Sequence, residues 1–234
     1  MAEFSPEEIA TLYAGFNAPI AALDCGKRCS PYNERGVPFC CDTHHAVPAA
    51  SQSEWQYLQA NTDLWKLWQP LDPVAGESLR AQLPQGGVLI ACLGHHFCQR
   101  NFRSLTCRAF PFFPYFDRQG EFIGLSYYWE YEHRCWVISN LSIVSKEYLG
   151  EFIRAFEAVF ERLPEEKASF AHFSVVMRRV FGRAKRAIPL LHRNGKLFKI
   201  TPRNGRMRRV SVEKLPRYGV YKIAAAMPFW DEKD

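Results

Sequence analysis

Eight cysteines carry the clearest chemistry of this chain, and all of them lie within its first 135 residues. They are Cys25, Cys29, Cys40, Cys41, Cys92, Cys98, Cys107 and Cys135, and the last 99 residues contain none. Cysteines that only fill a core would be scattered among the other apolar residues. Their confinement indicates a common cause, which is disulfide bonding or metal binding, because thiolates are soft metal ligands.

The N-terminal sequence favours metal over disulfides. Ser5-Pro6-Glu7-Glu8 is typical of a helix start, with serine as the cap, proline at the first helical position and acids in the first turn. It is not the basic and then apolar pattern of a secretory signal. No stretch approaches about 18 uncharged apolar residues, so no membrane span is expected. We therefore expect a cytoplasmic protein, and in a reducing compartment clustered cysteines more often bind metal.

The spacing of the cysteines leaves the metal and the number of sites open. Neighbouring side chains in an extended chain point in opposite directions, so Cys40 and Cys41 are not both expected to bind one ion. Zinc sites favour Cys-x2-Cys pairs, and the chain has none, whereas iron–sulfur proteins tolerate irregular spacing. We predict that the eight cysteines hold a metal, either as a [4Fe-4S] cluster, which we favour, or as zinc. His45 and His95 are alternative fourth ligands.

Two parts of the cysteine pattern resemble a known family. The early group ends in the doublet Cys40-Cys41, and the later group contains Cys107-Arg108-Ala109-Phe110-Pro111. Together they resemble the bacterial cysteine-cluster proteins described as a zinc- or iron-chelating domain, whose motif is Arg-Pro-x-x-Cys-Arg-x-Phe-Pro. Arg103 stands at the first motif position and Ser104 replaces its proline. The resemblance covers about residues 25–135, and Cys135 matches a cysteine that often follows.

The family likeness implies a metal site and leaves an enzymatic alternative. Flagellin lysine N-methylase is similar in this motif, and the likeness to it suggests an iron–sulfur cluster in a protein-modifying enzyme. The chain departs from the family in its early group, where ten residues separate Cys29 from Cys40. It also has no glycine-rich turn after a predicted strand that would hold S-adenosylmethionine, because Gly86-Gly87 precedes one.

Arg103 and Arg108 are predicted to contact the cofactor. Four thiolates around zinc, or around an oxidised [4Fe-4S] cluster, leave a net charge of about −2. Guanidinium N–H groups beside the sulfur atoms would offset this charge. The alternative is that both are ordinary exposed arginines.

Hydrophobic periodicity and turn residues predict an α+β protein. Helices are expected over about 5–20, 51–68, 76–83, 145–163 and 166–187, and strands over 88–91 and 122–131. Asn194-Gly195 and Asn204-Gly205 predict tight turns of a meander with strands at about 189–193, 196–201 and 206–212. Residues 25–50 and 92–118 are expected to be loops. The result is an irregular, metal-centred body with several helices and a small C-terminal antiparallel β-meander.

The 234 residues, of which 47% are hydrophobic, suffice for a core without disulfides. We expect a cysteine-cluster metal-binding region over 1–144 and helices plus the basic meander over 145–234, packed as one domain.

Positive charge is concentrated near the C-terminal end of the chain. Residues 178–217 contain fourteen Lys and Arg and a single acid, Glu213, so they carry +13, while the whole chain carries +6. The remaining residues therefore sum to −7. This segment is predicted to bind nucleic acid or another acidic partner, or to pack against the acidic remainder of its own chain. The oligomeric state is left open.

The function predicted from the residues is metal binding in the cytoplasm. The alternatives are a cluster-containing, lysine methylase-like enzyme, and a structural-zinc protein whose basic surface binds a partner.

Overall fold

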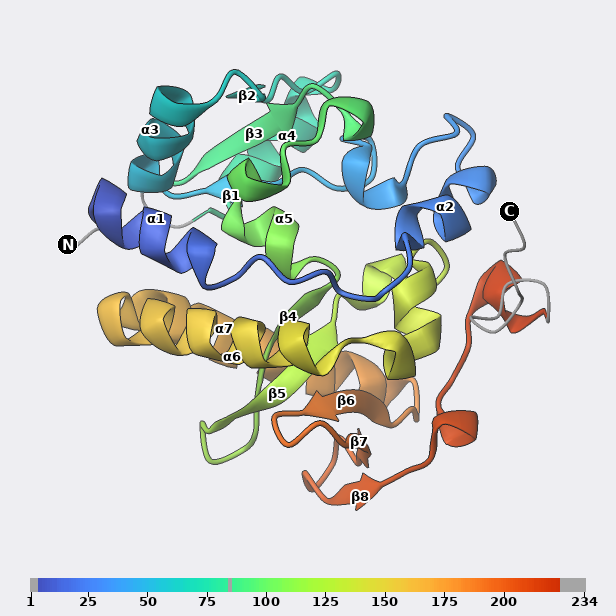
Figure 1. Cartoon of the computed structure of the whole chain (residues 1–234). Helices are drawn as coiled ribbons and strands as arrows, with labels where there is room; N and C mark the ends of the chain where they lie inside the picture. The colour runs from blue at the N-terminus through green and yellow to red at the C-terminus, as the bar shows by residue number, and fades with distance from the viewer. Residues whose placement is uncertain (1–3, 84–85, 224–234) are drawn as a thin grey trace.

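The computed structural model describes residues 4–83 and 86–223 and shows an α+β protein, as predicted (Figure 1). The α-helices are α1 (Pro6–Ala14), α2 (Cys25–Cys29), α3 (Gln52–Asn61), α4 (Pro73–Arg80), α5 (Leu105–Ala109), α6 (Lys146–Arg162) and α7 (Pro164–Arg183). The strands are β1 (Ala49–Ala50), β2 (Trp65–Leu67), β3 (Val88–Cys92), β4 (Phe112–Phe116), β5 (Phe122–Tyr127), β6 (Ile188–His192), β7 (Leu197–Ile200) and β8 (Met207–Arg209). Short 3-10 turns connect several of them.

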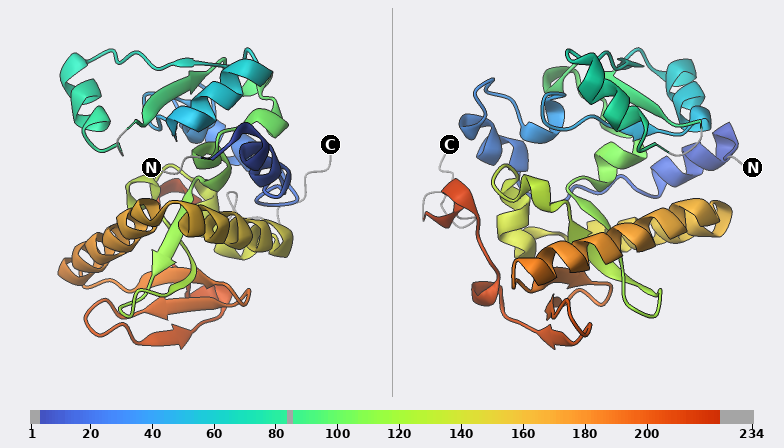
Figure 2. Two further views of the ribbon diagram at one scale, coloured as in Figure 1. Left: turned by 90° about the vertical axis from the view of Figure 1, so that its left-hand side faces the viewer. Right: turned by 180° about the vertical axis from the view of Figure 1, so that it is seen from behind.

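The elements form two layers (Figures 1 and 2). One layer holds an antiparallel sheet of order β1-β3-β2 with α3 and α4, and the other holds a five-stranded antiparallel sheet with α6 and α7. Helices α1 and α5 lie between the layers. No helix within the described ranges is long and apolar enough to cross a membrane.

The predicted meander is confirmed, and it extends a larger sheet. Strands β6, β7 and β8 pair in sequence order, and β6 also pairs with β5, so the sheet has the order β4-β5-β6-β7-β8. Gly124 on β5 has a φ of +152°, and a Cβ there would lie 2.3 Å from the Leu191 carbonyl oxygen. Only glycine permits this close approach of the two strands. The sheet therefore joins residues on both sides of position 144.

The loop expected over residues 92–118 is wrong at its C-terminal end, which forms α5 and β4. Pro111 and Pro114 suggested irregular chain, but β4 is an edge strand of the sheet, where a proline in place of an N–H donor is tolerated. Phe112 and Phe116 belong to one core cluster with α6, while Phe113 and Tyr115 belong to another with α7. Because helices cover both faces, every residue of β4 is buried.

Two predicted helices are shorter than expected. Helix α1 begins with the expected capping box of Ser5 and Glu8 but ends at Ala14, before Phe16. Helix α3 ends at Asn61, and residues 65–67 form β2 on the edge of the small sheet. The aromatic run around Trp65 has helical spacing, yet tertiary pairing with β3 decides its conformation.

The long amphipathic helix is confirmed as α6. The Ser145 hydroxyl accepts a hydrogen bond from Tyr148 N at 3.0 Å and caps its first turn. The apolar stripe is buried as expected: Tyr148, Leu149, Phe152, Ile153, Phe156, Val159 and Phe160. After α7 and the sheet, the chain returns toward α2, where Tyr221 packs on Tyr32 with ring centroids 5.6 Å apart.

Candidate metal centre

The eight cysteines come from elements that are distant in the sequence. Cys25 and Cys29 begin and end α2, Cys40 and Cys41 lie in the turn Phe39–Cys41, Cys92 ends β3, Cys98 follows the turn His95–Phe97, Cys107 is on α5, and Cys135 precedes the turn Trp136–Ile143. All are free thiols; Cys29 and Cys135 are buried, Cys98 is exposed and the others are half-buried. We call the segments 25–41 and 92–107 together the cysteine region.

Cys41 is the electrostatic centre of the cysteine region. Burial raises the pKa of five thiols, and the negative charge of a Cys41 thiolate raises each of them further. These are Cys25, Cys29, Cys92, Cys98 and Cys107. Because such effects weaken with distance, Cys41 lies near thiols of both segments. The fold therefore gathers the early and late cysteine groups into one region.

Cys40 and Cys41 form the closest pair, with sulfur atoms 3.9 Å apart. The expectation that they point in opposite directions is wrong, because the doublet lies in a 3-10 turn and not in extended chain. The hydrogen bond to Cys40 lowers the pKa of Cys41, and the charge of Arg103 lowers it further against the effect of burial. The same hydrogen bond raises the pKa of Cys40, and burial adds to it. Cys41 is therefore the member of the pair that ionises first.

Cys135 lies on another side of the group. Burial raises its pKa, and the charges of Cys25 and Cys29 add to this effect, so it is near α2. Its side chain belongs to the main hydrophobic core, together with Cys29.

The thiols are gathered but not arranged as a coordination sphere. Across residues 4–83 and 86–223, no three His, Cys, Asp or Glu side chains are placed to hold one metal ion. Burial raises the pKa of Cys25 and of Cys107 to about 12, so both are protonated at neutral pH. Metal binding to such groups has to displace protons and draw the sulfur atoms together.

Arg103 shows how the region fits a negatively charged metal group. Its positive charge lowers the pKa of Cys98 and of Cys107, against the larger effect of burial. Its Nε is buried and has no hydrogen-bond partner among the described residues. An unsatisfied buried N–H costs about 1–3 kcal/mol. A thiolate or sulfide sulfur would supply the missing acceptor, and the soft thiols nearby are the ligands that zinc and iron prefer.

Arg108, the second arginine predicted to contact a cofactor, has its donors directed to the backbone. It is 2% exposed. Its guanidinium donates to the carbonyl oxygens of Arg103 at 2.8 Å, Asn101 at 2.7 Å and Tyr13 at 3.2 Å, and also to that of Phe16. These bonds join α5 to the end of α1, so the geometry gives Arg108 a structural task.

The histidines that lie near the cysteines in the sequence have other partners. His44 lies 3.0 Å from Asp42 Oδ1 and is exposed. His45 packs against Phe39 with ring centroids 5.0 Å apart, and His95 and His96 stack on each other at 3.8 Å.

A second feature is a hollow of about 380 Å³ lined by five arginines: Arg118, Arg178, Arg179, Arg183 and Arg203. Three come from α7, one from the β7–β8 turn, and one from the β4–β5 turn. None forms an ion pair with an acid in the part of the chain that the structure describes. Arg118 lies outside the basic segment, so sequence reasoning missed it, and no local signal links it to α7.

Comparisons with protein-family models, curated proteins and solved structures find no match to this chain. The family likeness therefore depends on the cysteine motif alone.

Proposed function

We propose that this is a metal-binding protein whose cysteine region holds a [4Fe-4S] cluster or zinc. The observation that carries the proposal is the convergence of thiols from both segments on Cys41. Cys41, Cys98 and Cys107 share Arg103 as a neighbouring charge, and this favours them as ligands. A fourth ligand would come from Cys25, Cys29, Cys40 or Cys92. Cys135 is a candidate for a second group with Cys25 and Cys29.

A bound metal would link the two segments of the cysteine region. An iron–sulfur cluster would supply electron transfer or Lewis-acid chemistry, and zinc would supply a structural cross-link. In both cases Arg103 would donate its buried N–H to a sulfur atom and offset the negative charge of the site. Because binding draws loop segments together, it should also stabilise the fold.

The direct test is purification under anaerobic conditions, followed by measurement of metal, of acid-labile sulfide and of the visible absorption spectrum. Near-stoichiometric iron and sulfide in a brown protein would support the cluster, and colourless protein with one or two zinc ions would support zinc. Folded protein that remains free of both metals, even after reconstitution with each under reducing conditions, would overturn the proposal.

A second candidate function is the binding of nucleic acid at the arginine-lined hollow. Five guanidinium groups that have no ion pair among the described residues repel one another around this hollow, and phosphate groups would relieve the repulsion. Arg118 lies outside the basic segment 178–217 but meets arginines of α7 and of the β7–β8 turn at the hollow. This convergence supports phosphate binding at the hollow in addition to the net charge of the segment. Binding would depend mainly on the phosphate backbone and weaken steeply with salt.

Charge reversal tests the hollow against net charge. The triple variant R179E/R183E/R203E alters the hollow, and K196E/R208E/R209E makes the same change in net charge at exposed positions that do not line it. With a fluorescent single-stranded oligonucleotide as the probe, the first variant should lose at least tenfold in affinity and the second clearly less. Equal losses would show that only net charge matters.

A further inference from the structure

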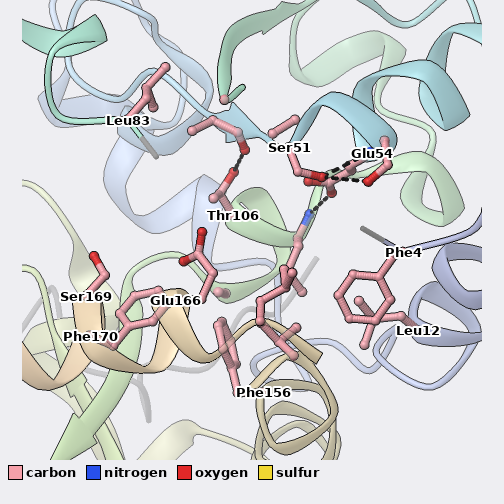
Figure 3. Close-up of a pocket in the computed structure, with 18 of the residues that line it drawn as sticks. Phe4, Leu12, Ser51, Glu54, Leu83, Thr106, Phe156, Glu166, Ser169 and Phe170 are labelled. Atoms are coloured by element: carbon pink, nitrogen blue, oxygen red, sulfur yellow. Dashed lines mark hydrogen bonds between the residues drawn. The ribbon is translucent and has the colours of Figure 1, made fainter. Parts of the chain in front are cut away.

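A cavity of about 340 Å³ lies between the two layers, and none of the residues that line it is a cysteine (Figure 3). Its walls come from α1, α3 and α5 on one side and from α6 and the start of α7 on the other. Most of the wall is apolar or aromatic, and the main contributors are Leu12, Leu105, Phe112, Phe156, Val159 and Phe170. A cavity of this size and lining is typical of sites for small organic molecules.

The carboxylate of Glu54 also lines the cavity, and only one of its two oxygens accepts hydrogen bonds from the described residues. Glu54 is 8% exposed, and its Oε1 accepts hydrogen bonds from the Tyr13 hydroxyl and from Leu105 N, both at 2.6 Å. Among the described residues, no hydrogen bond reaches its Oε2. This oxygen is not one of the fully enclosed side-chain atoms that lack a partner, so it is accessible from the cavity and can accept an N–H or O–H group from a ligand.

A second carboxylate, Glu166, faces the same space from the first turn of α7. It is half-buried, and Figure 3 shows it between Thr106 and Phe170. Within the described ranges it has neither a hydrogen bond nor an ion pair. Burial raises the pKa of Glu166, and the charges of Glu165 and Glu54 raise it further, so the charge of Glu54 acts on Glu166 across the cavity.

No basic side chain lines the described wall, although the charge of Arg108 behind it lowers the pKa of Glu54 against the larger effect of burial. Three glutamates line the cavity, and no lysine, arginine or histidine does so. The net charge of the lining is therefore negative, and the lining also contains aromatic rings, whose faces attract cations. Phe156 and Phe170 meet edge to face, with ring centroids 5.5 Å apart, close to Glu166.

We propose that this cavity binds a small organic amine, whose ammonium group donates to Glu54 and Glu166 and whose apolar body packs among Phe112, Phe156 and Phe170. A primary ammonium has three N–H donors, which suits two carboxylates that lie on opposite walls. The site is distinct from the metal function and does not depend on it.

Three probes with nearly the same body and different charge test the proposal: phenethylamine, phenethyl alcohol and hydrocinnamate. Each is titrated by calorimetry or ligand-observed NMR into the protein as isolated. The amine should bind at least tenfold more tightly than the alcohol, and the anion should bind most weakly. An alcohol that binds as tightly as the amine, or no binding of the amine at millimolar concentration, would overturn the proposal.

Variants locate the site. E166Q keeps the shape and removes one charge, and it should weaken the amine about tenfold while leaving the alcohol unchanged. E147Q is the matched control, because Glu147 is an exposed acid in the first turn of α6. S169W should fill the mouth of the cavity from an exposed position and weaken both probes. Amine binding that survives E166Q and S169W in folded protein would place it elsewhere and contradict the proposal.

Discussion

The guanidinium of Arg108 donates through Nε to the carbonyl oxygen of Arg103 at 2.8 Å, and the two arginines have opposite surroundings. Arg108 is buried and also donates to backbone carbonyls of α1 and of the turn Arg100–Phe102. Arg103, five residues earlier, lies beside the thiols of the cysteine region and keeps a buried Nε that has no partner in the part of the chain that the structure describes. Arg108 thus stabilises the backbone around the candidate metal centre, and Arg103 remains available to offset the negative charge of a bound metal group.

Replacing Arg108 by methionine should destabilise the protein strongly. The carbonyl groups of Tyr13, Phe16 and Asn101 would each lose a donor, and an unsatisfied buried group costs about 1–3 kcal/mol. We expect a loss of at least about 3 kcal/mol in the free energy of unfolding of the metal-free protein, measured with urea. R103M is the control and should change it by less than about 1 kcal/mol, because it removes an unsatisfied donor. Equal losses would contradict the different roles of the two arginines.

The two cysteines of the doublet, Cys40 and Cys41, should differ in how much they contribute to metal binding. Cys41 is the more readily ionised thiol and interacts with both segments, so C41S should abolish most of the bound iron or zinc. C40S removes the thiol whose pKa is raised, and it should retain at least half of the metal. Metal analysis of the two anaerobically purified variants checks this. The reverse order, or equal retention, would refute the assignment of Cys41 as the ligand.

The buried carboxylate of Glu132 should depend on Arg186. Glu132 is 5% exposed and accepts hydrogen bonds from Arg186 and, at 3.1 Å, from the Tyr127 hydroxyl. R186A would leave this charge unpaired and should cost about 3 kcal/mol, at the lower end of the range for buried pairs, because the arginine side chain is 39% exposed. The double variant E132A/R186A should lose less than the sum of the single changes. Additive losses in urea unfolding would show that the pair is not coupled.

The acids of the cavity should make stability depend on pH. Burial raises the pKa of Glu54 and of Glu166 above the ordinary value of 4.5, so the folded protein binds more protons than the unfolded chain does. The free energy of unfolding should therefore fall as the pH rises from about 4.5 through the raised pKa values. E54Q/E166Q should show a flatter profile above the ordinary glutamate pKa of 4.5. An unchanged slope would show that other groups set it; E147Q is the control.

The predictable parts of this protein are those that near neighbours in the chain decide. The stripe from Tyr148 to Phe160 repeats with the period of a helix, and Ser145 caps it, so α6 could be placed closely. Asn194-Gly195 and Asn204-Gly205 tolerate positive φ, so the meander could be placed as well. The cysteine count and its confinement, together with the charge of residues 178–217, likewise needed no structure to favour a metal and an acidic partner.

Only the tertiary structure decided the rest, because these features depend on packing between distant segments. Strand β4 forms in a proline-rich stretch because α6 and α7 cover both of its faces. Thiols from α2, β3 and α5 come near enough to Cys41 for its charge to raise their pKa. Arg108 donates to a backbone carbonyl of α1, whereas the Nε of Arg103 has no partner among the described residues. The cavity between the layers brings Glu54 and Glu166 together across 112 positions of sequence, a distance over which no local pattern carries information.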